Sequence, residues 1–329
     1  MIIFSFFYNR EKEVNTSITS LLESAPENSK VILVNDGSTD NTLFELRKFA
    51  TDPRVTLIDQ ANRGLSKSLS ALIPKYIEMY NPQYIAIHGA GDVCDKYKFK
   101  KQIQYLEQNP DIVALGTGYD IVSKETGQRI KRIEGLAVAT RESLYKHVPF
   151  THGTVIYRKE AYLKAGGYNH LFYYCQDWDF YFRLLPFGKI VRYPEVLYTK
   201  YIFSDGASFN PKKKIEQLKY KSIILSRKVS DAVYEEKLRQ LREEGIDSVV
   251  TGIDFNREKM QSKITLIAAG ELNLAREWTL LEDKKKDLPN IILRSILSFM
   301  IFLKFPAYLL PKVYRIISNL KKLIKIGNN

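Results

Sequence analysis

The chain has 329 residues, of which 45% are hydrophobic and 26% are charged. This is enough apolar material for one large or two modest cores, so the composition excludes a disordered tail or linker. Fifty lysines and arginines against 37 acidic residues give a formal net charge of +13, which suits a polyanion, an anionic lipid surface or a phosphorylated small molecule. The two cysteines, Cys94 and Cys175, are too few for a disulfide framework and favour a reducing compartment.

The first part of the chain alternates short apolar runs with amphipathic helical patterns. Strands are expected at 2–7, 31–34, 55–58 and 84–87, and helices at 15–24, 42–49, 66–80 and 98–108. Continuous apolar strands separated by amphipathic helices are typical of a parallel sheet covered on both faces. The sequence therefore predicts an α/β fold for residues 1–115. The apolar start has no basic residues before it, which favours a buried strand over a secretory signal.

A polar cluster follows each of these four strands. In open α/β sheets the ligand lies at the carboxyl ends of the strands, so we expect the functional site there. The four clusters are Tyr8–Arg10, Asn35–Asp40, Asn62–Gly64 and His88–Asp92.

The second of these clusters has two interpretations. Gly37 permits a tight turn after its strand, and Asp40 or Asn41 can cap the following helix. Alternatively, Asp36 can accept a hydrogen bond from a ligand N–H group such as that of a nucleobase. The local pattern by itself leaves both open.

The rest of the chain has a different pattern. Shorter strands are expected at 112–117, 119–123, 129–132, 154–157 and 191–193, around a helix at 176–185, which predicts a mixed sheet that extends the first one. Further helices are expected at 216–227, 231–244 and 256–281. The longest later apolar stretch, 295–303, is well short of the roughly 20 residues that cross a bilayer, so no transmembrane helix is expected.

Five motifs in a fixed order carry a resemblance to a known family. Tyr8-Asn9 ends the first strand, and the other four motifs are Asn35–Asp40, Asn62–Ser66, Phe150–Arg158 followed by Gly166–Tyr168, and Gln176–Leu184. Together they resemble the inverting glycosyltransferases of family 2, over residues 1–208. This resemblance implies the GT-A fold and a nucleotide-sugar donor.

The resemblance also implies roles for residues on the donor side. Asp36 and the Tyr8-Asn9 turn would hold the nucleobase. Arg63 and Lys67 would approach the diphosphate, because charged hydrogen bonds to phosphate are strong. On their residue types alone, these two cations could equally be a solvated loop and helix face.

On the acceptor side, Asp177 would be the general base, an effect worth about 10²–10⁴ in rate. Its position just before a helix would also suit a cap. Gln176 precedes it in the motif. His152 could contact the acceptor or bond to backbone, while Tyr168 and Trp178 could lie under a sugar ring or belong to the core.

Two positions depart from the family. Most members carry Asp-Ala-Asp-Asp after the fourth strand, and the third residue of that run binds a divalent metal. Here the stretch is Gly89-Ala90-Gly91-Asp92, so Gly91 offers no side chain. Phe203 stands where many members supply a histidine. Asp92 is the remaining metal candidate, and a requirement for Mg²⁺ or Mn²⁺ is left open.

Three explanations compete for this departure. Asp92, with Asp95 or His88, could hold a metal from a shifted position. Alternatively, cations and backbone N–H groups alone could stabilise the leaving diphosphate. Finally, the chain could be an inactive relative that binds nucleotides or saccharides as a scaffold, although the retained Asp177 argues against this.

The working hypothesis is an inverting glycosyltransferase that acts on a surface-glycan or lipid-linked saccharide. The predicted domains are a catalytic domain at 1–209, with donor and acceptor halves at 1–115 and 116–209, a helical extension at 210–286 and a tail at 287–329. A nucleic-acid partner is not expected, because no helix-turn-helix, zinc-finger or aromatic RNA-binding motif accompanies the basic residues.

The tail has a basic and apolar pattern. From Lys284 to Asn329 there are ten basic residues against one acidic residue, interleaved with apolar residues at helical spacing near the end. Such a segment can lie in the interface of an anionic membrane, or it can pack on the catalytic domain with its charges solvated. We expect the first, and hence a cytoplasmic enzyme on the inner face of the cell membrane.

Overall fold

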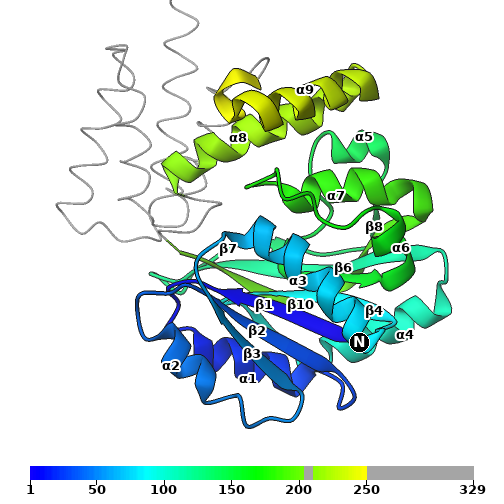
Figure 1. Ribbon diagram of the computed structural model, residues 1–329. Helices are drawn as coiled ribbons and strands as arrows, with labels where there is room; N and C mark the ends of the chain where they lie inside the picture. The colour runs from blue at the N-terminus through cyan, green and yellow to red at the C-terminus, as the bar shows by residue number, and fades with distance from the viewer. Residues whose placement is uncertain (204–209, 250–329) are drawn as a thin grey trace, which may run out of the picture. The chain divides into compact units, whose positions relative to one another are not determined.

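The computed structural model describes residues 1–203 and 210–249 (Figure 1). The strands are β1 (Ile2–Phe7), β2 (Lys30–Asp36), β3 (Val55–Gln60), β4 (Tyr84–Gly89), β5 (Val93–Cys94), β6 (Ile112–Ser123), β7 (Arg129–Ile133), β8 (Ala137–Val138), β9 (Ile156–Arg158) and β10 (Lys189–Ile202). The α-helices are α1 (Val14–Ser24), α2 (Thr42–Arg47), α3 (Leu65–Tyr80), α4 (Lys98–Gln108), α5 (Arg141–Leu144), α6 (Lys159–Lys164), α7 (Gln176–Leu184), α8 (Pro211–Leu225) and α9 (Asp231–Glu244). Short 3₁₀ turns are η1 (His152–Thr154), η2 (Leu185–Phe187), η3 (Ser226–Lys228) and η4 (Ile246–Val249).

The strands form one mixed sheet in the order β3-β2-β1-β4-β9-β6-β10-β5. Strands β3, β2, β1 and β4 are parallel, whereas β9 runs antiparallel to both β4 and β6. The carboxyl ends of the four parallel strands therefore meet at one edge. The predicted α/β class and the first eight predicted elements are confirmed.

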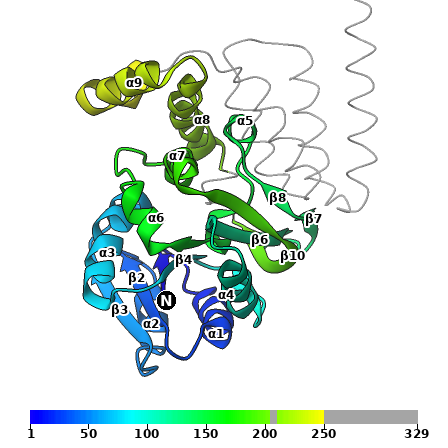
Figure 2. The same cartoon turned by 90° about the vertical axis from the view of Figure 1, so that its right-hand side faces the viewer.

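Alternating side chains of the parallel strands fill two cores. Phe4, Ile32 and Ile85 belong to one buried cluster, which also includes side chains of α3, while Ile3 and Leu33 belong to a second cluster with α1 and α4. Figure 2 shows α3 on one side of these strands and α1 with α4 on the other. Because successive strand residues face opposite sides, this explains the continuous apolar runs in the sequence.

One predicted break in a strand is absent. The sequence pattern separates 112–117 from 119–123, but β6 runs through Gly118 without interruption. A Cβ at Gly118 would lie 2.7 Å from the carbonyl oxygen of Glu195 and 2.8 Å from that of Ile133. Glycine at this position permits a close approach of the neighbouring backbone. The sequence pattern alone predicts a turn at the same glycine.

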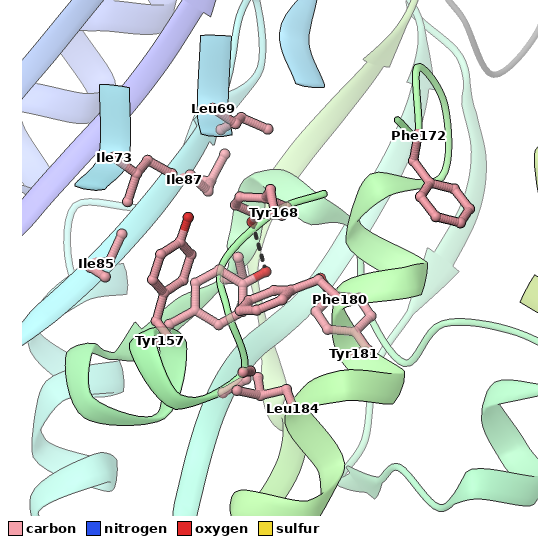
Figure 3. Packing of buried hydrophobic residues seen from close by; sticks show 14 of the residues in the cluster. Leu69, Ile73, Ile85, Ile87, Tyr157, Tyr168, Phe172, Phe180, Tyr181 and Leu184 are labelled. Atoms are coloured by element: carbon pink, nitrogen blue, oxygen red, sulfur yellow. Dashed lines mark hydrogen bonds between the residues drawn. The ribbon is translucent and has the colours of Figure 1, made fainter. Parts of the chain in front are cut away.

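The first core cluster also anchors α7 through aromatic rings. Phe180 packs 4.9 Å from Tyr168 and 5.2 Å from Tyr157, measured between ring centroids. Figure 3 shows the α3 and β4 side chains that lie beside these rings, among them Leu69 and Ile87. Aromatic pairs of this kind add about 0.5–1.5 kcal/mol each beyond the area they bury, so the position of α7 is well defined.

The chain divides into two compact units. One comprises residues 1–120, 132–201 and 220–249, and the other comprises 121–131, 202–219 and 250–329. Within the first unit, buried side chains of the 220–249 segment share the core cluster of α7. The predicted helix at 256–281 and the predicted tail at 287–329 lie outside the described residues, and the domain division remains a prediction. Within 1–203 and 210–249, every helix is too short or too polar to cross a membrane.

Candidate functional site

The loops after β1 and β2 are joined to each other. Asn9 has a left-handed backbone (φ 50°), and its Oδ1 accepts a hydrogen bond from the backbone N–H of Thr39 at 2.9 Å. The N–H of Asn9 donates to Ser38 Oγ at 3.1 Å, and that of Arg10 donates to Thr42 Oγ1 at 2.7 Å. The structure thus brings the predicted Tyr8-Asn9 turn against the second polar cluster, with the Tyr8 ring 48% exposed.

Asp36 accepts four hydrogen bonds from other residues of the chain. The residue is 4% exposed. Its Oδ1 accepts hydrogen bonds from Gln60 Nε2 (2.6 Å), Ser68 Oγ (3.1 Å) and the N–H of Arg63 (3.1 Å), and its Oδ2 accepts the N–H of Gly64 at 2.9 Å. Three of these donors share Oδ1 and one uses Oδ2, which keeps one acceptor position. Two of the four donors are the backbone N–H groups of Arg63 and Gly64. Asp36 therefore fixes the loop that precedes α3.

That loop also meets the segment before α7. A Cβ at Gly64, which has φ +78°, would lie 2.9 Å from Cε2 of the Tyr173 ring. Ser66 Oγ donates to the carbonyl of Asn169 at 3.2 Å. Arg63 and Lys67 are exposed at this place. The structure brings the donor and acceptor motifs together here, and it adds Tyr173, which no motif indicates.

Asp92 is buried at the turn after β4. Its Oδ1 accepts the backbone N–H of Tyr201 at 3.0 Å, and its Oδ2 accepts the hydroxyl of Tyr198 at 2.9 Å. The same hydroxyl accepts the N–H of Gly89 at 2.9 Å, and a Cβ at Gly153 would lie 2.1 Å from it. Burial raises the pKa of Asp92 to about 6, although the positive charge of Lys200 acts against this rise.

The described residues around Asp92 do not fit a divalent metal. Hard cations prefer several oxygen ligands, and Asp92 supplies a single carboxylate, each oxygen of which accepts one hydrogen bond. His88 lies buried with Nε2 3.2 Å from Ser17 Oγ, and Asp95 is exposed with Oδ1 accepting the N–H of Tyr97. Residues 1–203 and 210–249 contain no group of three His, Cys, Asp or Glu side chains suited to a metal.

Asp177 is half-buried in the first turn of α7, two residues after Cys175, which has a left-handed backbone (φ 60°). Its Oδ1 accepts the N–H of Trp178 at 2.8 Å. Burial lowers the pKa of His152, while the nearby Asp177 carboxylate acts in the opposite direction. The fold therefore places Asp177 within electrostatic reach of the predicted acceptor-side histidine.

The other predicted acceptor-side residues have partners in the chain. His152 Nε2 lies 2.7 Å from the Tyr168 hydroxyl, which donates to the Tyr157 hydroxyl at 3.0 Å. Tyr168 and Gln176 are buried. Trp178 Nε1 donates to the carbonyl of Leu144 at 2.7 Å. Tyr168 is thus a core residue that holds His152.

A family model described as glycosyl transferase family 2 matches residues 3–176, more than half of the chain. The chain belongs to this family. The match ends one residue before Asp177. The expected family is confirmed, and with it the expectation that the chain is a glycosyltransferase.

Two curated relatives agree with this family assignment. The chain is 27% identical over 195 residues to the amylovoran biosynthesis glycosyltransferase AmsE of Erwinia amylovora, covering 58% of this chain and 71% of that protein. It is 28% identical over 202 residues to an uncharacterized glycosyltransferase of Haemophilus influenzae, covering 58% of this chain and 61% of that protein. The matched stretch thus leaves a substantial part of each relative uncovered.

A solved structure shares the fold of this family member. TarS residues 1–349 of S. aureus, in complex with UDP-GlcNAc, is similar with a TM-score of 0.53 at 16% sequence identity, over 83% of this chain and 82% of that one. At this identity the likeness concerns the fold alone. The expected GT-A fold is confirmed.

Proposed function

We propose that this family 2 member transfers a sugar, with inversion, from a nucleoside-diphosphate sugar to a hydroxyl of a surface-glycan or lipid-linked saccharide. The observation that carries the proposal is the position of Asp177 at the start of α7, within electrostatic reach of His152 and next to the loop that contacts α3. The UDP-GlcNAc bound to TarS and the amylovoran pathway of AmsE support the donor and acceptor classes.

The donor would lie across the loops after β1 and β2. Tyr8 offers an exposed ring for the nucleobase, and Asn9 holds the turn beneath it. Arg63 and Lys67 offer exposed cations to the diphosphate. Because Asp36 accepts the backbone N–H groups of Arg63 and Gly64, we assign it the role of positioning the Arg63 loop.

Asp177 would act as the general base. Its carboxylate takes the proton of the acceptor hydroxyl, and the acceptor oxygen forms a bond to the anomeric carbon. The bond from that carbon to the diphosphate oxygen breaks on the opposite face, and the nucleoside diphosphate leaves with the electron pair. A single displacement of this kind inverts the anomeric configuration.

Release of nucleoside diphosphate from a panel of nucleotide sugars tests the proposal. We expect Asp177→Asn to lose transfer by at least a hundredfold while its affinity for the donor changes less than about threefold, since a general base acts on the transition state. Glu107→Gln is the matched control because Glu107 is an exposed carboxylate on α4, outside this site. More than a tenth of wild-type turnover in Asp177→Asn excludes Asp177 as the base.

The rival function is an inactive scaffold that binds nucleotides or saccharides. The replacement of the usual metal-ligand positions by Gly91 and Phe203 favours it. A scaffold would bind a nucleotide sugar without any release of nucleoside diphosphate that depends on Asp177.

The basic tail at 287–329, outside the described residues, would hold the enzyme on an anionic membrane surface in the cytoplasm. There the site would lie close to a lipid-linked acceptor. The excess of basic residues in this segment supports the proposal, because each Lys or Arg near such a surface adds about 1 kcal/mol.

A further inference from the structure

We propose that Lys200 binds the diphosphate of the donor and supplies the positive charge that a divalent metal provides in most family members. The inference rests on the proposed donor site. It names a residue that none of the sequence motifs indicates.

The first support is the position of Lys200 on β10. Tyr198 and Lys200 are two residues apart in this strand, so their side chains leave it on the same face. The Tyr198 hydroxyl bonds both Gly89 and Asp92 at the carboxyl end of β4. The next residue along, Tyr201, donates its N–H to Asp92. Lys200 is thus held beside the turn that carries the altered metal motif.

The second support is the charge that Lys200 exerts on its surroundings. Burial is the main cause of the raised pKa of Asp92 and of the lowered pKa of His152. In both cases Lys200 acts to lower the pKa, so its ammonium is within reach of both groups. Asp177 acts on the same histidine. The positive charge of Lys200 therefore acts both on the β4 turn and on the histidine that Asp177 also influences.

A second cation, in the loop after β1, acts on the same turn. Arg10, in the loop after β1, also lowers the pKa of Asp92, and its Nη1 donates to the carbonyl of Asn9 at 2.7 Å. Lys200 and Arg10 thus bring positive charge to Asp92 from two separate elements. Arg10 is held by its bond to Asn9 before a ligand arrives, and positive charge that is positioned in advance stabilises developing negative charge most effectively.

The third support is the chemistry of Asp92 itself. Its two oxygens each accept one hydrogen bond from β10, from Tyr198 and Tyr201, so Asp92 orders this strand beside Lys200. Gly91 adds no ligand. A lysine ammonium is a compact point charge suited to phosphate oxygens. In this proposal the charge of Lys200 replaces the charge of the metal, so the loss of the metal ligands and the presence of Lys200 belong to the same change of mechanism.

The affinity for UDP and for GDP, measured by calorimetry first in EDTA and then with Mn²⁺, tests this assignment. We expect the wild type to bind at least one of them in EDTA, with less than a threefold gain from Mn²⁺. Lys200→Met should weaken that binding tenfold or more, and Lys200→Arg should retain most of it. The matched control is Lys189→Met, because Lys189 lies on the same strand but pairs with Asp111 at 2.6 Å, and it should bind as the wild type does.

The parent nucleosides provide a second measurement. Uridine and guanosine lack the diphosphate, so Lys200→Met should not change their affinity. Equal diphosphate affinity in Lys200→Met and the wild type overturns the assignment, as does wild-type binding that requires Mn²⁺ or is absent altogether. Binding that depends on Lys200 without any sugar transfer would instead leave Lys200 in place and refute the proposed enzymatic function.

Discussion

The carboxylate of Asp179 and the guanidinium of Arg227 form an ion pair, with 3.2 Å between Oδ1 and Nη2. Asp179 is fully buried in the first half of α7, two residues after the proposed base, and Arg227 belongs to η3. The hydroxyl of Tyr234 in α9 also donates to Asp179, and Arg183 Nε donates to its Oδ2 at 2.9 Å. The helical segment after α8 is therefore bonded directly to the helix that carries Asp177.

Arg227→Met should destabilise the protein by about 1.5–3 kcal/mol, because buried Asp179 loses one charged hydrogen-bond partner while Arg183 and Tyr234 remain. Urea unfolding measures this change. Arg239→Met is the control, since Arg239 forms exposed ion pairs in α9 and its loss should cost under about 1 kcal/mol. Equal stability of the two variants would show that the Asp179–Arg227 pair contributes nothing to the position of α7.

Asp36→Asn should loosen the loop before α3. An amide has one acceptor oxygen and cannot replace a carboxylate that accepts four hydrogen bonds, so about 1–3 kcal/mol of local stability should be lost. Arg63 is exposed, and trypsin cleaves after arginine; the variant should therefore be cut there at least tenfold faster in the native state. Glu78→Gln, an exposed position on α3, is the control. Cleavage at the wild-type rate would argue against a positioning role for Asp36.

His88 makes stability depend on pH. Burial, helped by the positive charge of Lys98, lowers the pKa of His88 from 6.5 to about 3. Between these two pKa values His88 binds a proton in the unfolded chain but not in the folded chain. The free energy of unfolding is therefore largest above pH 6.5 and falls as the pH decreases toward 3.

His88→Gln should therefore lose less stability than the wild type between pH 6.5 and 4, by up to about 1.4 kcal/mol per pH unit. Urea unfolding at several pH values in this range measures the difference. Parallel stability profiles for the two proteins would mean that His88 keeps an ordinary pKa in the folded state.

Flotation with liposomes tests the tail. The full chain should rise with vesicles that contain anionic lipid and stay behind with neutral ones, and a chain that ends near Leu288 should not rise with either. Replacing Lys321, Lys322 and Lys325 with Gln should weaken binding at about 1 kcal/mol per charge removed. If the shortened chain floats as well as the full one, the proposed membrane contact of residues 287–329 is wrong.

The sequence by itself determines the α/β class and most of the elements of the first part of the chain. The helix predicted at 98–108 and the strand predicted at 2–7 have the bounds that the structure shows. These features follow from short-range periodicity, which a local pattern contains in full. The order of the motifs was also enough to indicate family 2 and to place Asp177 at the start of a helix.

Only the tertiary structure decided what the polar residues do there. Asp36 has the sequence context of a ligand-binding residue, but it also accepts four hydrogen bonds from donors up to 32 residues away along the chain. Asp92 is bound by Tyr198, which is 106 residues away. Tyr173 meets Gly64, and Lys200 comes beside Asp92, because the segment before α7 and strand β10 return to these loops. Such contacts depend on which strands pair and how loops close, and no local sequence pattern carries that information.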